Sequence, residues 1–254
     1  MKFTALFLIG SLAALGCTAQ VASVPPRVIY DGRIQPPEPR LTESERGRIQ
    51  YLAWEAAEQD AWNVGSDALS YCGGSDFVID GVAPGAFTTK GKQQAAYLYT
   101  YCYQRPGDLQ GIVIVQGNGI VAHYVFVNHF RELYALKDVN RNGFTELLLS
   151  GGFTGQGYTE NWINIAELGP QRRLLGQLDY DHPPQAYSDN CGTVETGGTW
   201  QSFVLRVVPS ASPTFTRQAI SGRCGAERVA TSIGTIKPLT LKPTPTGWLA
   251  GPLK

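Results

Sequence analysis

A run of alternating polar residues is the part of this 254-residue chain whose spacing is typical of a metal site. The run reads D-V-N-R-N-G-F-T-E over positions 138–146. Its candidate oxygen donors are Asp138, Asn140, Asn142, the backbone carbonyl of Phe144, and Glu146. Alternating side chains can converge from one tight loop, and Gly143 permits the sharp turn that such a loop needs. An all-oxygen donor set predicts calcium as the ligand.

The spacing excludes an EF-hand, because the twelfth position of that motif requires a bidentate acid and is Leu149 here. Only Asp138 and Glu146 among the donors carry a charge, so we expect weak affinity, with a Kd of about 10⁻⁴ to 10⁻³ M. A metal-free polar turn is the alternative interpretation, since Asn and Asp also stabilise turns through their own side chains.

The same residues resemble the calcium loops of FG-GAP (integrin-type propeller) repeats, in which D-x-[DN]-x-[DN]-G-x-x-[DE]-L links two strands. The matching residues are Asp138, Asn140, Asn142, Glu146 and Leu147. The resemblance implies a structural calcium ion held between two strands. The pattern occurs once in this chain, whereas propellers of this family carry several copies, so the resemblance implies at most part of a propeller.

Four tyrosines alternate with smaller residues at positions Tyr97, Tyr99, Tyr101 and Tyr103. In a β-strand all four rings lie on one face. Such a stripe is either a ligand-binding platform for sugar rings or peptide, or a core face whose hydroxyl groups reach solvent or backbone.

Signatures of catalysis are scarce in the sequence. His123 and His129 are about 20 Å apart along one strand, too far to share a metal. Asp181-His182 could serve a hydrolase only with a distant serine, and no H-E-x-x-H or G-x-S-x-G motif is present. The glycine-rich segment 151–158 lacks the features of a phosphate loop, and we expect a flexible loop there. We therefore expect a protein that is not an enzyme.

The N-terminus predicts export. Lys2 precedes an apolar run over 5–15, which is typical of a secretory signal. Ala14-Leu15-Gly16-Cys17 resembles a bacterial lipobox, which implies that Cys17 is lipidated and becomes the mature N-terminus. Thr18 in place of an aspartate is consistent with sorting to the outer membrane. Cleavage after Ala19, without a lipid, is the alternative.

Five cysteines are an odd number for an exported protein. Lipidation of Cys17 leaves an even set, namely Cys72, Cys102, Cys191 and Cys224. Four cysteines allow three connectivities, of which we favour the sequence-local pairs Cys72–Cys102 and Cys191–Cys224.

Composition and the positions of Pro-rich stretches divide the chain into four segments. We expect a signal peptide over 1–17, a Pro-rich tether over 18–40, a folded domain over 41–235 and a Pro-rich tail over 236–254. The balance of 21 basic and 21 acidic residues argues against a nucleic-acid partner.

The folded domain is predicted to be mainly β. Thr42 and Glu45 fit a capping box at the start of one helix of about 20 residues. Short apolar strands separated by turns follow, including a hairpin with Asn118-Gly119 in its turn. This pattern predicts an antiparallel domain, either partly propeller-like or a two-sheet sandwich.

Together these features predict an exported, lipid-anchored, calcium-binding component of the bacterial cell envelope, in the periplasm or at the cell surface. Its expected partners are the membrane and an envelope protein complex. A glycan- or peptide-binding module that uses the four tyrosines is the alternative, and a hydrolase is the third hypothesis.

Overall fold

The structure is a computed structural model that describes part of the chain. The described residues are 25–34, 40–64, 77–103, 108–170, 173–178, 186–192, 197–225 and 228–241.

One helix and thirteen strands make up the described part of the fold. They are β1 (Arg27–Asp31), α1 (Glu43–Val64), β2 (Val78–Gly85), β3 (Gln94–Cys102), β4 (Asp108–Gln116), β5 (Gly119–Asn128), β6 (Phe130–Leu136), β7 (Glu146–Gly155), β8 (Tyr158–Glu167), β9 (Arg173–Leu178), β10 (Tyr187–Asp189), β11 (Thr199–Val208), β12 (Thr214–Arg223) and β13 (Ser232–Leu239). The predicted fold class, mainly β with one N-terminal helix, is confirmed.

The strands form two antiparallel sheets. The smaller sheet has the order β2-β3-β4-β5, and the larger has nine strands along the path β13-β12-β11-β10-β8-β7-β6, with β1 beside β11 and β9 beside β8. Consecutive strands pair as neighbours through most of both sheets, so most connections are short hairpins. Within the described residues neither sheet closes into a barrel, and the arrangement is consistent with a sandwich.

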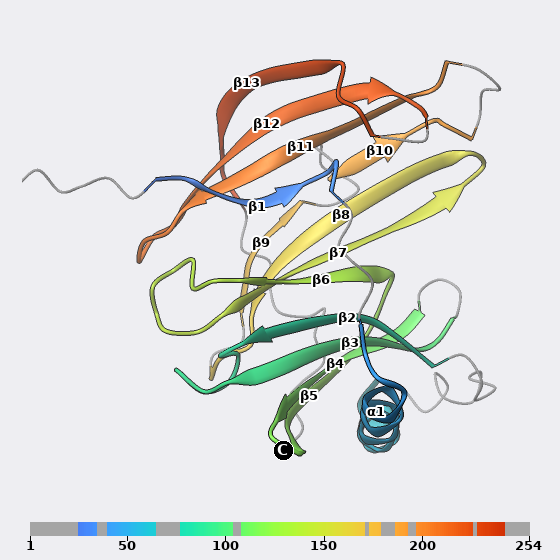
Figure 1. The fold of residues 1–254 in the computed structure, drawn as a ribbon, viewed down its shortest axis with the longest axis vertical. Coiled ribbons are helices and arrows are strands. Elements are labelled where there is room, and N and C mark those ends of the chain that lie inside the picture. Colours follow the sequence, from blue (N-terminus) through green and yellow to red (C-terminus); the bar gives the residue numbers. More distant parts are fainter. Residues whose placement is uncertain are drawn as a thin grey trace, which may run out of the picture.

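The elements are stacked in layers (Figure 1). The helix α1 covers one face of the smaller sheet, the strands β6–β8 of the larger sheet lie against its other face, and β1 with β10–β13 forms the far layer. Leu147 and Leu149 pack toward the smaller sheet, whereas Leu148 between them packs toward the far layer. This strand is buried on both faces, which explains its uninterrupted apolar run.

The helix starts as the sequence predicts. The Glu45 backbone N–H donates to Thr42 Oγ1 at 3.2 Å, as a capping residue requires. Ile49 and Ala53 are fully buried against the smaller sheet, so the helix is fixed by its apolar stripe.

Two segments differ from the prediction. The expected tether contains β1, whose Ile29 and Tyr30 are buried beside β11, so 27–31 is part of the domain. The expected C-terminal tail likewise begins inside β13, and Leu241 beyond it packs into the core. Burial of apolar side chains outweighs the high proline content of the neighbouring sequence.

The turn of the β4–β5 hairpin lies one residue earlier than predicted. Gly117 and Asn118 form it, and Gly117 takes the left-handed φ of 60° that glycine adopts at no steric cost.

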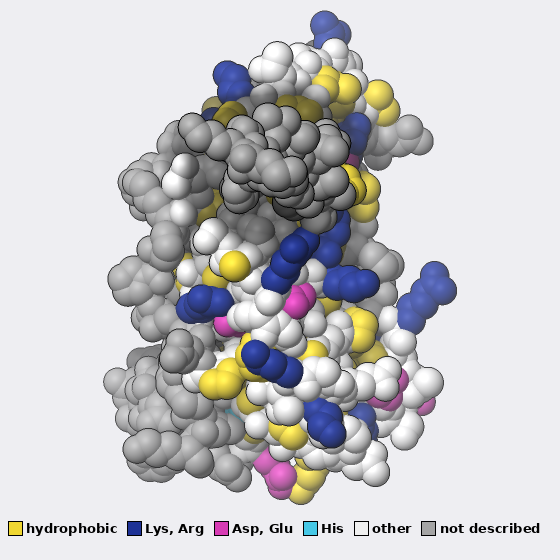
Figure 2. All heavy atoms as spheres, turned by 90° about the vertical axis from the view of Figure 1, so that its left-hand side faces the viewer, with side chains coloured by type: hydrophobic (Ala, Val, Ile, Leu, Met, Phe, Trp, Pro, Cys, Tyr) yellow, Lys and Arg dark blue, Asp and Glu magenta, His cyan; other side chains and the backbone are white. Residues whose placement is uncertain are grey.

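Figure 2 shows one face of the molecule, on which Lys and Arg side chains are spread over several layers with Asp and Glu among them. The positive charges on this face do not gather into one block.

Candidate metal site

The candidate calcium loop joins β6 to β7, as the resemblance implies, and its two ends are held together. Leu136 and Glu146 are paired across the two strands, so the intervening residues form a closed loop. Asp138 and Arg141 adopt left-handed φ values of 34° and 57°, and Gly143 has a φ of 90°. These turns fold the loop tightly on itself.

The short polar side chains turn inward and accept backbone hydrogen bonds. Asp138 Oδ1 accepts from the Asn142 N–H at 2.9 Å, and Asp138 Oδ2 accepts from the Gly143 N–H at 3.0 Å. Asn142 Oδ1 accepts from the Phe144 N–H at 2.9 Å, and Asn140 Oδ1 accepts from the Asn142 N–H at 3.2 Å. The structure therefore brings together the side chains that the sequence singled out.

Glu146, the first residue of β7, holds the loop through backbone hydrogen bonds. Its side chain is fully buried, and it accepts from the backbone N–H groups of Val139 at 2.9 Å and Asn140 at 3.4 Å. Burial raises the pKa of this carboxyl to about 7, and the nearby charge of Glu167 acts in the same direction, although the backbone hydrogen bonds oppose the shift.

Glu167 is a site residue that the sequence analysis missed. It is paired with Glu146 across β7 and β8, and it is almost completely buried. Its Oε2 atom accepts from Asn140 Nδ2 at 2.7 Å and from Asn142 Nδ2 at 2.5 Å. Arg173 on β9 forms an ion pair with the same carboxylate, with Nε to Oε1 at 3.1 Å. The available signal was an acid that directly follows the apolar pair Ile165-Ala166 at the end of β8.

The donor chemistry fits calcium. The loop offers two carboxylates, two amide oxygens and one backbone carbonyl, which is the oxygen-only set of a hard cation. In the part of the chain that the structure describes, no cluster of three or more His, Cys, Asp or Glu is placed to hold a metal, so the amide and carbonyl oxygens are essential to this fit. Each carboxylate oxygen that accepts one N–H keeps a second lone pair for a cation.

The tyrosine platform is corrected by the structure. Tyr97, Tyr99 and Tyr101 are at most 5% exposed and lie in the core beneath α1. Only Tyr103 is exposed, at 50%, and the Arg131 guanidinium lies 5.2 Å from the centre of its ring. The apolar face of α1 packs on the tyrosine rings and covers them. These rings are therefore core and do not form a binding surface.

The histidines have separate structural surroundings. His123 is buried, and its Nε2 atom is hydrogen-bonded to the hydroxyl of Tyr99. His129 Nδ1 lies 3.0 Å from Asp108, a buried carboxylate that also pairs with Arg131. Asp181 and His182 lie outside the described residues.

A small polar cavity of about 490 Å³ adjoins the Asp108 pair. Gly151 and Gly152 line it, and both belong to β7. The glycine-rich segment is therefore part of the β7–β8 hairpin, with its turn at Gln156 and Gly157, and the expected flexible loop is wrong.

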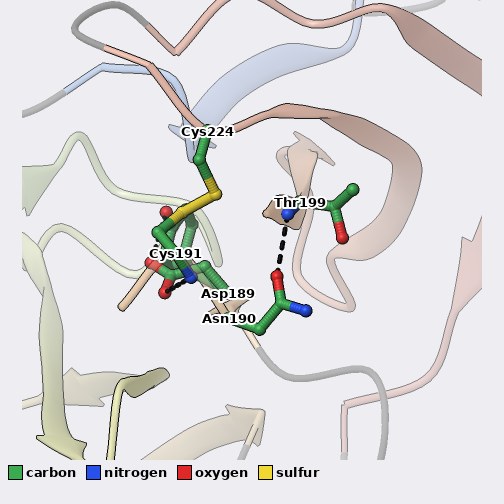
Figure 3. The surroundings of a disulfide bond; sticks show 6 residues. Asp189, Asn190, Cys191, Thr199 and Cys224 are labelled. Atoms are coloured by element: carbon green, nitrogen blue, oxygen red, sulfur yellow. Dashed lines mark hydrogen bonds between the residues drawn. A yellow bond between two sulfur atoms is a disulfide. The ribbon is translucent and has the colours of Figure 1, made fainter. Parts of the chain in front are cut away.

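The sequence-local pairing of Cys191 with Cys224 is confirmed, with the two Cα atoms 5.6 Å apart (Figure 3). Cys102 is also disulfide-bonded. Cys72 and Cys17 lie outside the described residues, so the Cys72–Cys102 pair and the lipidation of Cys17 stay predictions.

Among the described elements, no helix is both long enough and apolar enough to cross a bilayer. Comparisons of this chain with protein-family models, with curated proteins and with solved structures find no match.

Proposed function

We propose that the 138–146 loop binds one calcium ion, and that this ion stabilises an exported domain with a structural or binding role in the bacterial cell envelope. The ligands are Asp138, Asn140, Asn142, the Phe144 carbonyl and Glu146. The ion orders the loop that joins β6 to β7, and it takes no part in catalysis.

One observation carries this proposal. Glu167 accepts hydrogen bonds from the side-chain NH₂ groups of both Asn140 and Asn142. Both amide groups are thereby fixed with their oxygens toward the loop backbone: Asn140 Oδ1 shares the Asn142 N–H with Asp138 Oδ1, and Asn142 Oδ1 accepts from the Phe144 N–H. A carboxylate that orients metal ligands from behind is a common feature of protein metal sites.

Charge supports the same conclusion. Glu146 and Glu167 are both buried, and Arg173 is paired with only one of them. Buried charges are costly unless they are paired. A divalent cation beside Glu146 supplies the missing positive charge.

The test is a calcium titration of the chelator-treated protein, followed by thermal unfolding and by calorimetry. At 10 mM calcium and the expected affinity, ligand binding raises the free energy of unfolding by about 1–3 kcal/mol. For a domain of this size we expect the Tm to rise by about 3–10 °C.

Asp138→Asn removes one ligand charge and keeps an amide oxygen for the turn, so it abolishes the response to calcium. Asp189→Asn is the matched control, because Asp189, at the end of β10, also accepts a backbone N–H from two residues further on, that of Cys191 at 3.1 Å. A Tm that does not respond to calcium or chelator in the parent protein contradicts the proposal and leaves the metal-free polar turn.

Export and lipid attachment at Cys17 complete the proposed setting, with the membrane and an envelope complex as partners. The Cys191–Cys224 disulfide supports an oxidising compartment. The intact mass of protein from the native membrane fraction tests the anchor. A chain that begins at Cys17 with added acyl mass supports it, and an unmodified chain that begins at Gln20 contradicts it.

A further inference from the structure

Five polar residues form a transverse row across the larger sheet. This polar row consists of Glu160 (β8), Ser188 (β10), Gln201 (β11), Ser221 (β12) and Ser232 (β13), each paired with the next. Directly paired residues carry their side chains on the same face of a sheet. Because neighbouring strands lie about 4.8 Å apart, the row is about 19 Å long.

The polar row lines a surface groove. A hollow of about 650 Å³ has Glu160, Ser188, Gln201 and Ser221 among its lining residues. A second hollow, of about 390 Å³, shares the last three of these residues and extends to Ser232. Two hollows with three lining residues in common form one continuous groove along the row.

The groove offers hydrogen-bonding groups without an excess of charge. Gln201 Nε2 donates to Ser188 Oγ at 2.9 Å, and both side chains retain further capacity. The Oε2 atom of Glu160 is buried and has no hydrogen-bond partner among the described residues. This atom is not exposed to the groove, so the side-chain groups that a ligand can reach there are those of Gln201 and the serines of the row.

An exposed aromatic ring stands at one end of the groove. Tyr158 lines the larger hollow and is 52% exposed. It lies two residues before Glu160 on β8, so both side chains project from the same face. Its ring offers an apolar surface beside the polar row, and its hydroxyl adds another hydrogen-bonding group.

A disulfide lies beside residues that line the groove, and Figure 3 shows its immediate surroundings. Cys191 and Cys224 directly follow Asn190 and Arg223, which both line the larger hollow. Asn190 Oδ1 also accepts from the backbone N–H of Thr199 at 2.8 Å. The rim of the groove is therefore fixed before a ligand arrives, which lowers the entropic cost of binding.

The position of the row on a sheet face argues against a peptide. A peptide that adds as a strand needs the unpaired backbone groups of a sheet edge, whereas the first four residues of this row lie on strands that are paired on both sides. Recognition must come from side-chain hydroxyl and amide groups beside one aromatic ring. We infer that the groove binds a neutral, extended, β-linked oligosaccharide of about four sugar units, since the strand spacing is close to the length of one such unit.

This inference is independent of calcium, because Glu160 and Glu167 lie at opposite ends of β8. Calorimetric titration of the full chain with cellotetraose and with chitotetraose tests it, and the matching disaccharides serve as length controls. We expect one of the tetrasaccharides to bind at least tenfold more tightly than its disaccharide.

Two variants locate the site. Gln201→Ala and Tyr158→Ala should each weaken binding at least fivefold without changing the Tm. Gln50→Ala and Tyr51→Ala are the matched controls, since both residues are exposed on α1 and should leave binding unchanged.

Three results would overturn the inference. The first is that neither tetrasaccharide gives a heat of binding at millimolar concentration. The second is binding that Gln201→Ala and Tyr158→Ala leave intact, which would place the ligand elsewhere. The third is binding of anionic tetragalacturonate alone, lost in Arg223→Gln, which would identify a charged ligand.

Discussion

Glu146 and Glu167 are paired across β7 and β8, and both carboxylates are buried at the base of the same loop. Arg173 is paired with Glu167, while Glu146 is held by the backbone N–H groups of Val139 and Asn140. Two negative charges on directly paired residues repel each other, and burial strengthens the repulsion. The protonation of Glu146 is therefore coupled to the stability of the fold and to any cation that the loop binds.

The coupling predicts a pH dependence in the calcium-free protein. The pKa of Glu146 is raised to about 7 and that of Asp80 to about 6, in both cases first by burial. Between pH 5 and 7 the folded state therefore binds more protons than the unfolded state, so stability falls as the pH rises. We expect the free energy of unfolding to be on the order of 1–3 kcal/mol higher at pH 5 than at pH 8.

Urea unfolding at both pH values measures this difference. Asp80→Asn should remove only the share that Asp80 contributes, and 10 mM calcium should flatten the remaining slope by stabilising the ionised form of Glu146. A calcium-free protein that is more stable at pH 8 than at pH 5 contradicts this account.

A second prediction concerns Glu167, which touches the ligand side chains rather than the ion. Glu167→Gln ends the ion pair with Arg173 and loosens the orientation of Asn140 and Asn142. Loss of such a supporting group weakens metal binding by about 10–100-fold. Calorimetric titration with calcium measures the change.

The matched control is Asp31→Asn, which ends another Arg–carboxylate pair, the one with Arg33 at 2.6 Å, outside the loop. This variant should bind calcium as the parent does. If Glu167→Gln also leaves the affinity unchanged, the amide orientation has no role in binding.

Core and surface tyrosines should respond differently to truncation. Tyr99 is fully buried and stacks on Phe77 with ring centres 5.2 Å apart, so Tyr99→Ala should cost about 3–5 kcal/mol of unfolding free energy. Tyr103→Ala, at the exposed end of the same tyrosine stripe, should cost less than about 1 kcal/mol of unfolding free energy, since exposed side chains contribute little to stability. If denaturant unfolding shows equally small losses of unfolding free energy for both variants, Tyr99 is not a core residue and the tyrosine stripe is a surface feature.

The disulfide offers a prediction about the far layer. Cys191 and Cys224 are 33 positions apart, and a loop of this length is stabilised by about 3–4 kcal/mol in the chain-entropy model. The double variant Cys191→Ala/Cys224→Ala should lower the Tm by about 7–14 °C in scanning calorimetry. A smaller shift shows that the hydrogen bonds of Asp189 and Asn190 hold this rim without the covalent link.

Local signals in the sequence predicted much of the fold. The Thr42 cap marks the start of α1, and the turn signal at Asn118-Gly119 places the β4–β5 hairpin to within one residue. Three strands carry weaker signals, for different reasons. β1 lies within a Pro-rich segment, β10 has only three residues, and β13 contains Pro238, which an edge strand tolerates because it pairs on one side only.

The candidate site was predicted where its residues are adjacent in sequence and missed where strand pairing brings them together. Asp138 and Asn142 are four positions apart, so their spacing in the sequence indicates the motif. Glu167 reaches the loop only because β8 pairs with β7, and Arg173 only because β9 pairs with β8. The register of antiparallel strands depends on tertiary packing, which no local motif encodes.

The inclusion of β1 in the larger sheet limits how far the domain can stand from a membrane. If Cys17 carries the lipid, the chain from position 17 to Arg27, where β1 begins, is a leash of at most about 36 Å even when fully stretched. A tether that continued to position 40 would have more than twice that reach. The β1 edge of the domain is thus confined to a shell no deeper than about one bilayer thickness above the lipid surface. With the lipid at Cys17, β1 would therefore stay close to the membrane, and the reach of the other surfaces would be set by the size of the domain itself.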